Sequence, residues 1–307
     1  MFHHFHGKNH EKSQGSISAK QFIKIIKFLK KKYNLINADV FLNKIINKKI
    51  NNNDACLTFD DSLKCQIDIA LPILNKEKIQ AFFFLYTSAF TSKKNMFEIF
   101  RYFRMNNYKT VDFFYKDFFL MLKKNNRKKF EYFKKNYDKK YLKEYSFYTE
   151  SDKKFRFCRD KILNKNIYES IMFNLMRKKN FNYKKIIKKL LMSKKDLMKL
   201  KKFNQVIGLH SHDHSTNIEK MSYYKQLTDY KKNIFFLKKN LNLNPNSMSH
   251  PFGRYNNETI KVLSEIGLKI GFLSNFKKGK ISSNFEIPRY DHTHILKQIN
   301  ENNNFYK

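Results

Sequence analysis

The chain has few of the residue types that break or cross-link a backbone. Its 307 residues include no Trp, four Pro, seven Gly and three Cys. Cys56, Cys65 and Cys158 are too few and too scattered for a disulfide framework or a cysteine-rich zinc site, which is typical of a reducing compartment. A chain of this length can bury a full hydrophobic core, and 32 Phe with 18 Tyr indicate a folded protein, not a disordered one.

Long apolar runs are also absent. No stretch approaches the roughly 18 apolar residues that cross a bilayer. The first ten residues, MFHHFHGKNH, lack the basic start and the apolar centre of a signal peptide. These absences predict a cytoplasmic protein.

Acidic residues are scarce beside basic ones, 26 against 63, which gives a formal net charge of +37. Such an excess is typical of proteins that bind nucleic acid or an anionic surface. However, the lysines are spread along a chain rich in Asn, Ile and Phe, as an AT-biased coding sequence produces. Compositional drift and an anionic partner (a membrane surface, a lipid phosphate, a nucleotide sugar or nucleic acid) both remain open. Nucleic acid is the least favoured, because no helix-turn-helix, zinc-finger or RNP signature is present.

Hydrophobic periodicity near the N-terminal end predicts a βαβ unit. Residues 17–33 carry apolar side chains at helical spacing. A short buried strand follows at 55–59, then a helix over 61–76, then a strand at 81–86 that is apolar on both faces, as strands of parallel sheets are.

Residues 97–203 differ from the rest. They contain no Pro or Gly and repeatedly show helical spacing, with many Phe, Tyr and Lys. This pattern predicts a helical insertion, and it contains no metal-binding or nucleophile motif.

The alternation of strands and helices then resumes. Strands are predicted at 205–209, 247–253 and 269–274, with helices at 219–240 and 256–267. We therefore expect one α/β domain over 1–307 with parallel strands, interrupted by the helical insertion. In such folds the chemistry lies at the carboxyl ends of the strands.

Polar residues follow two of these strands directly. Asp60 and Asp61 end the stretch CLTFDD, and His210 and His214 follow VIGL in the stretch HSHDH. Adjacent carboxylates repel each other unless a positive group lies nearby. One carboxylate and two imidazoles suit zinc and similar divalent ions, and they leave positions open for water. A solvated turn and surface histidines are the alternative explanation.

Four segments together, TFDD, AFFFLY, GLHSHDH and HPFGRYN, resemble the polysaccharide deacetylases of the NodB-homology type, carbohydrate esterase family 4. The resemblance covers about 55–92 and 204–290. It implies a distorted (β/α) barrel with the helical region as a long insertion. It also implies metal-dependent hydrolysis of an N-acetyl group on an amino sugar, with a divalent ion such as zinc as the cofactor.

The resemblance also implies the roles of individual residues. Asp60 matches the general base, and Asp61 matches a metal ligand together with His210 and His214. A backbone N–H at Phe252 would stabilise the oxyanion. The residues expected to contact the substrate are Pro251, Phe252 and Tyr255.

The third segment departs from the family pattern. Many members carry an Arg two residues before the Pro of this turn, where the present chain has Ser249. Arg289, in EIPRY, matches a Pro-Arg of one branch and is a candidate substitute for orienting Asp60. A structural ion pair explains Arg289 equally well.

The family also requires a histidine that protonates the departing amine. One branch supplies it from the end of a first strand, and MFHHFH looks like that branch, with His6 as the best match and His3 and His4 as rivals. The late alternatives are His292 and His294. A merely histidine-rich start is the remaining explanation.

Several functions are therefore to be compared. The first is a deacetylase acting on a cytoplasmic intermediate of surface-glycan biosynthesis, either nucleotide-linked or lipid-linked. The second is an inactive relative that binds a sugar or a lipid, which the departure at Ser249 motivates. The third is a nucleic-acid-binding protein, for which the charge is the one argument.

Overall fold

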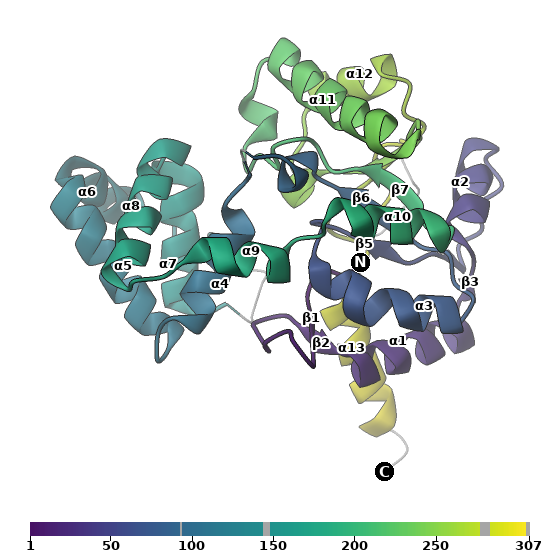
Figure 1. Ribbon diagram of the computed structural model, residues 1–307, viewed down its shortest axis with the longest axis horizontal. Coiled ribbons are helices and arrows are strands. Elements are labelled where there is room, and N and C mark those ends of the chain that lie inside the picture. Colours follow the sequence, from purple (N-terminus) through teal and green to yellow (C-terminus); the bar gives the residue numbers. More distant parts are fainter. Residues whose placement is uncertain (93, 144–147, 277–282, 305–307) are drawn as a thin grey trace. The chain divides into compact units, whose positions relative to one another are not determined.

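The computed structural model describes residues 1–92, 94–143, 148–276 and 283–304 (Figure 1). The chain divides into two compact units. The first, here called the barrel unit, comprises Met1–Asn95 and Lys188–Lys307. The second, the insertion unit, is Met96–Ile187.

A parallel sheet forms the centre of the barrel unit. Its strands pair in chain order: β5 (Thr58–Phe59), β6 (Phe82–Leu85), β7 (Val206–Leu209), β8 (Ser247–Ser249) and β9 (Ile270–Phe272). The strands β6 and β7 are aligned with Phe82 opposite Val206. Two short parallel pairs lie outside this sheet: β1 (Phe5–His6) with β2 (Ile17–Ser18), and β3 (Asn34–Leu35) with β4 (Asp54–Ala55).

The sheet is strongly curled. The rings of Phe82 and Phe84 on β6 lie 5.2 and 5.3 Å from the ring of Phe272 on β9. In a flat sheet, two intervening strands would hold β6 and β9 about 14 Å apart. These rings therefore meet on the concave face, and the predicted distorted (β/α) barrel is confirmed.

Segments from both ends of the chain extend this sheet. Phe2 bridges in parallel to Phe59 at one edge, and Ile287 bridges in parallel to Phe272 at the other. The backbone N–H of His292 then donates to the carbonyl of Met1 at 3.2 Å. This hydrogen bond links the N-terminal segment to the segment that follows Ile287.

Alternate residues of β6 point into two different hydrophobic clusters, as the period of a strand requires. Phe82 and Phe84 pack with Phe41 and Phe272, whereas Phe83 and Leu85 face the outer helices. Gly208 on β7 leaves room for this packing, because a Cβ there would lie 2.6 Å from the ring of Phe84.

Helices cover the outer face of the sheet, except α2 (Ala38–Ile46), whose Phe41 packs in the inner cluster. The first of them is held at its start by a capping box between Ser18 and Gln21, and it buries Phe22, Ile25 and Leu29 on one face. Figure 1 shows α11 and α12 side by side, and α13 against α1. The helices of the barrel unit are α1 (Ala19–Lys32), α2 (Ala38–Ile46), α3 (Leu71–Lys76), α10 (Lys194–Lys202), α11 (Tyr223–Leu241), α12 (Asn257–Glu265) and α13 (His292–Asn304). Single turns of 3-10 or π helix occur at Gln66–Ala70, Thr87–Phe90, Ile218–Lys220 and Pro251–Gly253.

The insertion unit is helical where it is described, and its core is aromatic. Rings of Phe103, Phe114, Phe118 and Phe155 pack together at centroid distances of 4.9 to 6.5 Å. Its helices are α4 (Phe97–Asn106), α5 (Val111–Asn125), α6 (Arg127–Asn136), α7 (Glu150–Phe157), α8 (Lys165–Lys178) and most of α9 (Tyr183–Leu190), with a π turn at Cys158–Ile162. The predicted range 97–203 contains nearly all of this unit and also α10, which packs on β7 and α11 in the barrel unit.

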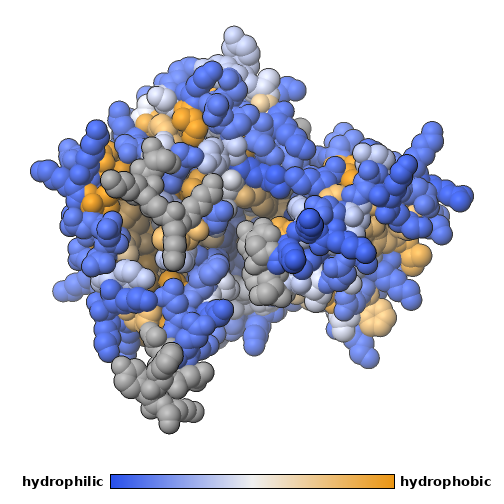
Figure 2. Space-filling model, turned by 180° about the vertical axis from the view of Figure 1, so that it is seen from behind, coloured by the Kyte–Doolittle hydropathy of each residue, from blue (hydrophilic) through white to orange (hydrophobic). Residues whose placement is uncertain are grey.

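The face of the molecule in Figure 2 is mainly hydrophilic. Figure 2 shows one face of the molecule on which hydrophobic residues form small, separate patches. Among the described helices, none is long and apolar enough to cross a membrane.

Candidate active site

The predicted polar segments lie at one end of the sheet. Asp60 directly follows β5, His210 follows β7, and His250 follows β8. Because these strands are parallel, their carboxyl ends lie at the same edge. Residues separated by about 190 positions in the sequence are thereby brought together.

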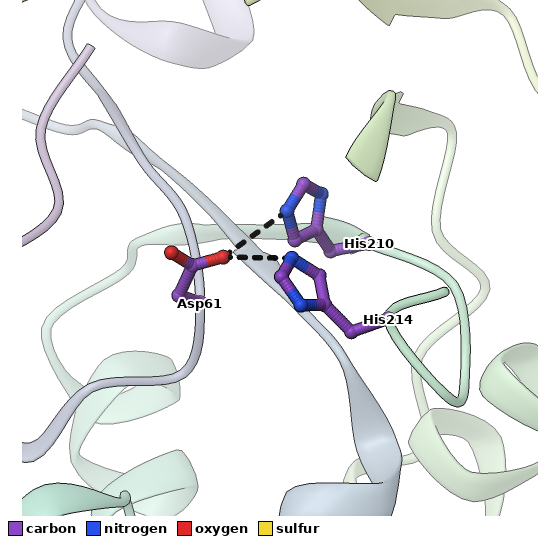
Figure 3. A group of neighbouring side chains, drawn as sticks. All are labelled: Asp61, His210 and His214. Carbon is purple, nitrogen blue, oxygen red and sulfur yellow. Dashed lines mark ion pairs between the residues drawn. The ribbon is translucent and has the colours of Figure 1, made fainter. Parts of the chain in front are cut away.

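Asp61, His210 and His214 converge, as their spacing suggested. Each offers one ligand atom, and these atoms all lie within 4.8 Å of one another. The Nε2 atoms of His210 and His214 lie 3.3 and 3.0 Å from Asp61 Oδ1. Figure 3 marks both ion pairs with dashed lines. All three side chains are buried. A carboxylate and two imidazoles directed at one point are a donor set that fits a divalent ion.

The orientation of His210 is fixed by Ser249. Its Nδ1 lies 2.9 Å from the carbonyl oxygen of Ser249 and 2.7 Å from the Ser249 hydroxyl. A carbonyl oxygen can only accept, so Nδ1 carries a proton, and Nε2 is the ring nitrogen that is directed at Asp61. This arrangement, with the second ring nitrogen held by a backbone carbonyl, is usual for metal-ligating histidines.

The neighbouring charges shift the pKa values of this cluster. Burial acts to raise the pKa of Asp61, but the charge of His214 and hydrogen bonds from both histidines hold it well below its usual value. Burial acts to lower the pKa of both histidines. For His210 the two carboxylates outweigh burial and raise the pKa, whereas for His214 burial prevails and the pKa is lowered.

Asp60 forms a buried, bidentate pair with Arg289. Arg289 Nη1 donates to Asp60 Oδ1 at 2.9 Å and Nη2 donates to Oδ2 at 2.8 Å. A further bond runs from Nη1 to the hydroxyl of Thr58 at 3.1 Å. Burial alone would raise the pKa of Asp60, but the guanidinium, with smaller contributions from the nearby histidines, lowers it to about 2. Arg289 thus supplies a cation to Asp60, and it approaches that carboxylate from a segment 229 residues away in the sequence.

Of the histidines considered as proton donors, His3 lies beside the carboxylates. Its Nε2 is 3.9 Å from Asp60 Oδ2 and 3.8 Å from Asp61 Oδ2. The pairing of Phe2 with Phe59 brings this about, because it sets residue 3 next to residue 60. The opposite oxygen of Asp61 faces the two loop histidines.

The other histidine candidates have different surroundings. His6 lies on β1, and its Nδ1 is 2.8 Å from the hydroxyl of Ser16. His4 lies next to the start of β2, where its carbonyl accepts the N–H of Ile17. His292 is buried with its ring 6.0 Å from the ring of Phe2, and the N–H of His294 donates to the carbonyl of Asp291.

The turn Pro251–Gly253 lies against the cluster of Asp61, His210 and His214. Phe252 has a left-handed backbone, with φ of 56°, and its ring lies 4.8 Å from the ring of His214. Pro251 is buried at the start of this turn. Tyr255 stacks on His250 with ring centroids 4.5 Å apart, and its hydroxyl donates to Glu286.

Two site-supporting residues had no counterpart among the predictions. Asp229 and Asn233, one turn apart on α11, accept backbone N–H groups of the loop that carries His210 and His214. They are polar residues at helical spacing from the buried Leu237 and Leu241 of α11, which is the signal that could have identified them.

Comparison with known proteins identifies the family and the fold. A family model described as "Polysaccharide deacetylase" matches residues 114–271. The chain belongs to the polysaccharide deacetylase family. The matched range includes GLHSHDH and HPFGRYN but not the aspartate pair. A search of curated proteins finds no match.

Solved structures of deacetylases are similar in fold over almost the whole chain. The Streptococcus pyogenes deacetylase PplD in complex with acetate is 15% identical, with a TM-score of 0.53 and coverage of 96% of this chain and 94% of its own. For IcaB from Ammonifex degensii the values are 13%, 0.54, 94% and 88%. The de-N-acetylase from Aggregatibacter actinomycetemcomitans is 12% identical, with a TM-score of 0.53 and coverage of 97% of both chains. At these identities the similarity establishes the NodB-type fold, and the branch with the N-terminal histidine stays a prediction.

Proposed function

We propose that this chain is a metal-dependent hydrolase that removes the N-acetyl group from an amino sugar. The observation that carries the proposal is the convergence of Asp61, His210 and His214 beside a second carboxylate, Asp60, that Arg289 keeps ionised. A charged base next to a three-ligand site with open positions is what amide hydrolysis by activated water requires.

The residues divide the reaction between them. Asp61, His210 and His214 would hold a divalent ion, with zinc as the first candidate, and such an ion would lower the pKa of water and polarise a carbonyl. Asp60 accepts the proton of the attacking water. The backbone N–H of Phe252 stabilises the oxyanion, and Pro251, Phe252 and Tyr255 contact the sugar. Acetate and a free amino sugar are the products.

We assign the proton transfer to the leaving nitrogen to His3. A general acid must lie within reach of the group that it protonates, and His3 is the candidate beside both aspartates. The N-terminal position agrees with the branch to which the sequence is similar. The first choice from the sequence, His6, is instead bonded to Ser16.

We also propose a class of substrate. We favour a phosphate-bearing intermediate of surface-glycan biosynthesis, nucleotide-linked or lipid-linked, because the formal charge of +37 favours anionic ligands and anionic membrane surfaces. For such a substrate the Michaelis constant should rise with salt. The cytoplasmic location stays a prediction from the sequence.

The proposal is tested by acetate release from a panel of N-acetylated nucleotide sugars and oligosaccharides, with and without a chelator. We expect release that stops with the chelator and returns with added zinc. Asp60→Asn should abolish turnover and keep ion binding, whereas Asp61→Asn should lose both. Normal deacetylation by Asp60→Asn would contradict the assignment. A wild-type chain that holds no divalent ion would favour the inactive sugar- or lipid-binding relative.

A further inference from the structure

The loop that carries two of the candidate ligands has an unfavourable backbone. In the loop His210–His214, the backbone φ is positive at Ser211 (60°) and at His214 (50°). Side chains other than glycine adopt this left-handed region at an energetic cost, and such residues persist where the surroundings hold them. The shape of this loop therefore depends on contacts from outside it.

One helix supplies many of those contacts. Both carboxylate oxygens of Asp229 on α11 accept backbone N–H groups of the loop, Oδ2 from His212 at 2.7 Å and Oδ1 from Asp213 at 3.0 Å. One turn later, Asn233 Oδ1 accepts the N–H of His210 at 3.2 Å. Successive N–H groups next to a left-handed residue form a concavity for an anion, and here the anion is a side chain of the same protein.

The same helix also ties this loop to the neighbouring strand end. Asn233 Nδ2 donates to the carbonyl of Leu85 and to the hydroxyl of Thr87, both at 3.1 Å. The Thr87 hydroxyl pairs with His212 Nδ1 at 2.8 Å, and the N–H of Ser88 donates to the His212 carbonyl at 2.9 Å. The loop is thus held between α11 and the segment after β6.

Burial of the Asp229 carboxylate is energetically unfavourable. Asp229 is 7% exposed, and among the described residues no Lys, Arg or His forms an ion pair with it. Burial raises its pKa. A buried carboxylate without a cation destabilises a fold unless its hydrogen bonds compensate. Its two bonds both go to the loop, so its contribution is concentrated there.

We propose that Asp229, assisted by Asn233, is a positioning residue that sets the His210–His214 loop in its ion-binding shape before the ion arrives. The inference rests on the proposed function, since it assumes that the loop binds a divalent ion. An isosteric change separates this role from simple support of the fold. In Asp229→Asn one acceptor oxygen is replaced by an NH2 group, which opposes the N–H of His212 or Asp213.

The test compares Asp229→Asn with a matched control, Asp152→Asn. Asp152 is also a buried carboxylate that accepts a backbone N–H, from Thr149, but it lies in the insertion unit. Zn²⁺ affinity is measured for the full chain by competition with a chromophoric chelator, and kcat is measured against free Zn²⁺. We expect Asp229→Asn to bind Zn²⁺ about 10- to 100-fold more weakly, with most of kcat recovered at saturating Zn²⁺. Asp152→Asn should bind like the wild type, even if it melts at a lower temperature.

Each other outcome overturns the inference. Equal Zn²⁺ affinity in Asp229→Asn and the wild type would remove the positioning role and leave the proposed function intact. A kcat loss that saturating Zn²⁺ does not restore would do the same. No Zn²⁺ binding by the wild type would overturn the proposed function as well.

A measurement on the unaltered chain covers the case in which Asp229→Asn does not fold. In the metal-free wild type, the amide hydrogens of His212 and Asp213 should exchange slowly with solvent, because both are bonded to a buried carboxylate. Fast exchange of both in the metal-free chain would show that the ion, and not Asp229, shapes the loop.

Discussion

Two histidine-rich segments of this chain look alike in the sequence and differ in the fold. In HSHDH, two of three histidines turn to the same carboxylate, Asp61. In MFHHFH, His3 lies beside the aspartates while His6 is bonded to Ser16. The loop follows a strand of the central sheet and is folded back by left-handed residues, whereas the N-terminal segment leaves the sheet to pair β1 with β2. Histidine spacing is therefore informative only together with the path of the backbone that carries it.

The largest loss of activity is expected for substitutions in the His210–His214 loop. His210→Ala or His214→Ala removes one of three ligands, so we expect no bound divalent ion after purification and acetate release at least about a thousandfold lower. His212→Ala, in the same loop, should keep its ion because its ring faces Thr87. Elemental analysis of the purified variants measures this. A full ion complement in His214→Ala would show that His214 is not a ligand.

The next effect separates the histidines of the N-terminal segment. His3→Gln should lower kcat about a hundredfold to ten-thousandfold, the range for a lost general acid, with ion binding retained. His6→Gln should stay within about threefold of the wild type. Steady-state kinetics with a Zn²⁺ titration distinguishes the two. The opposite order, with His6 essential and His3 dispensable, would restore the choice made from the sequence.

A third prediction concerns the carboxylate that His3 faces. The pKa of Asp60 is lowered to about 2, so this side chain stabilises the fold above the pKa of an unfolded Asp, and the contribution is lost as pH falls from about 4 to 2. In Arg289→Gln a buried carboxylate loses its cation, which should cost about 3–5 kcal/mol of unfolding free energy at pH 7. Without the guanidinium, burial raises the pKa of Asp60, so the acid limb of kcat/KM should move to higher pH.

Urea unfolding at several pH values provides the control for this variant. The stability difference between wild type and Arg289→Gln should shrink as pH falls below the raised pKa, because the protonated carboxyl no longer needs a cation. A difference that is constant from pH 7 to 3 would mean that Arg289 supports the fold without acting on the charge of Asp60.

The smallest effect is expected at Ser249. In Ser249→Ala the carbonyl that accepts from His210 Nδ1 remains, and the hydroxyl at 2.7 Å is lost. We expect Zn²⁺ affinity to fall less than about tenfold, by the same chelator competition. A loss as large as that in His210→Ala would mean that the hydroxyl, and not the carbonyl, fixes the ring.

Much of the fold, and the convergence of Asp61, His210 and His214, follows from the sequence for a local reason. Apolar runs followed at once by polar residues mark strand ends, and parallel strands bring Asp61, His210 and His214 to one edge. The extent of the insertion was less accessible, because α10 has the same periodicity as the helices before it and its packing on β7 is a tertiary fact. The position of His3 depends on the pairing of Phe2 with Phe59. An extended segment this short carries no sequence signal that predicts its pairing partner. Helical periodicity does not distinguish Asp229 from other residues of α11. Its partners are backbone N–H groups, which no sequence motif identifies.

The pairing of Asp60 with Arg289 also has a consequence for the order in which the protein is made. The two residues are separated by 229 positions, so Asp60 leaves the ribosome roughly 10 to 45 s before its guanidinium partner at ordinary rates of synthesis. During that interval burying the carboxylate is unfavourable, and water is its better surrounding. The barrel unit contains segments from both ends of the chain, so it cannot enclose Asp60 with its partner until the whole insertion unit has been synthesised.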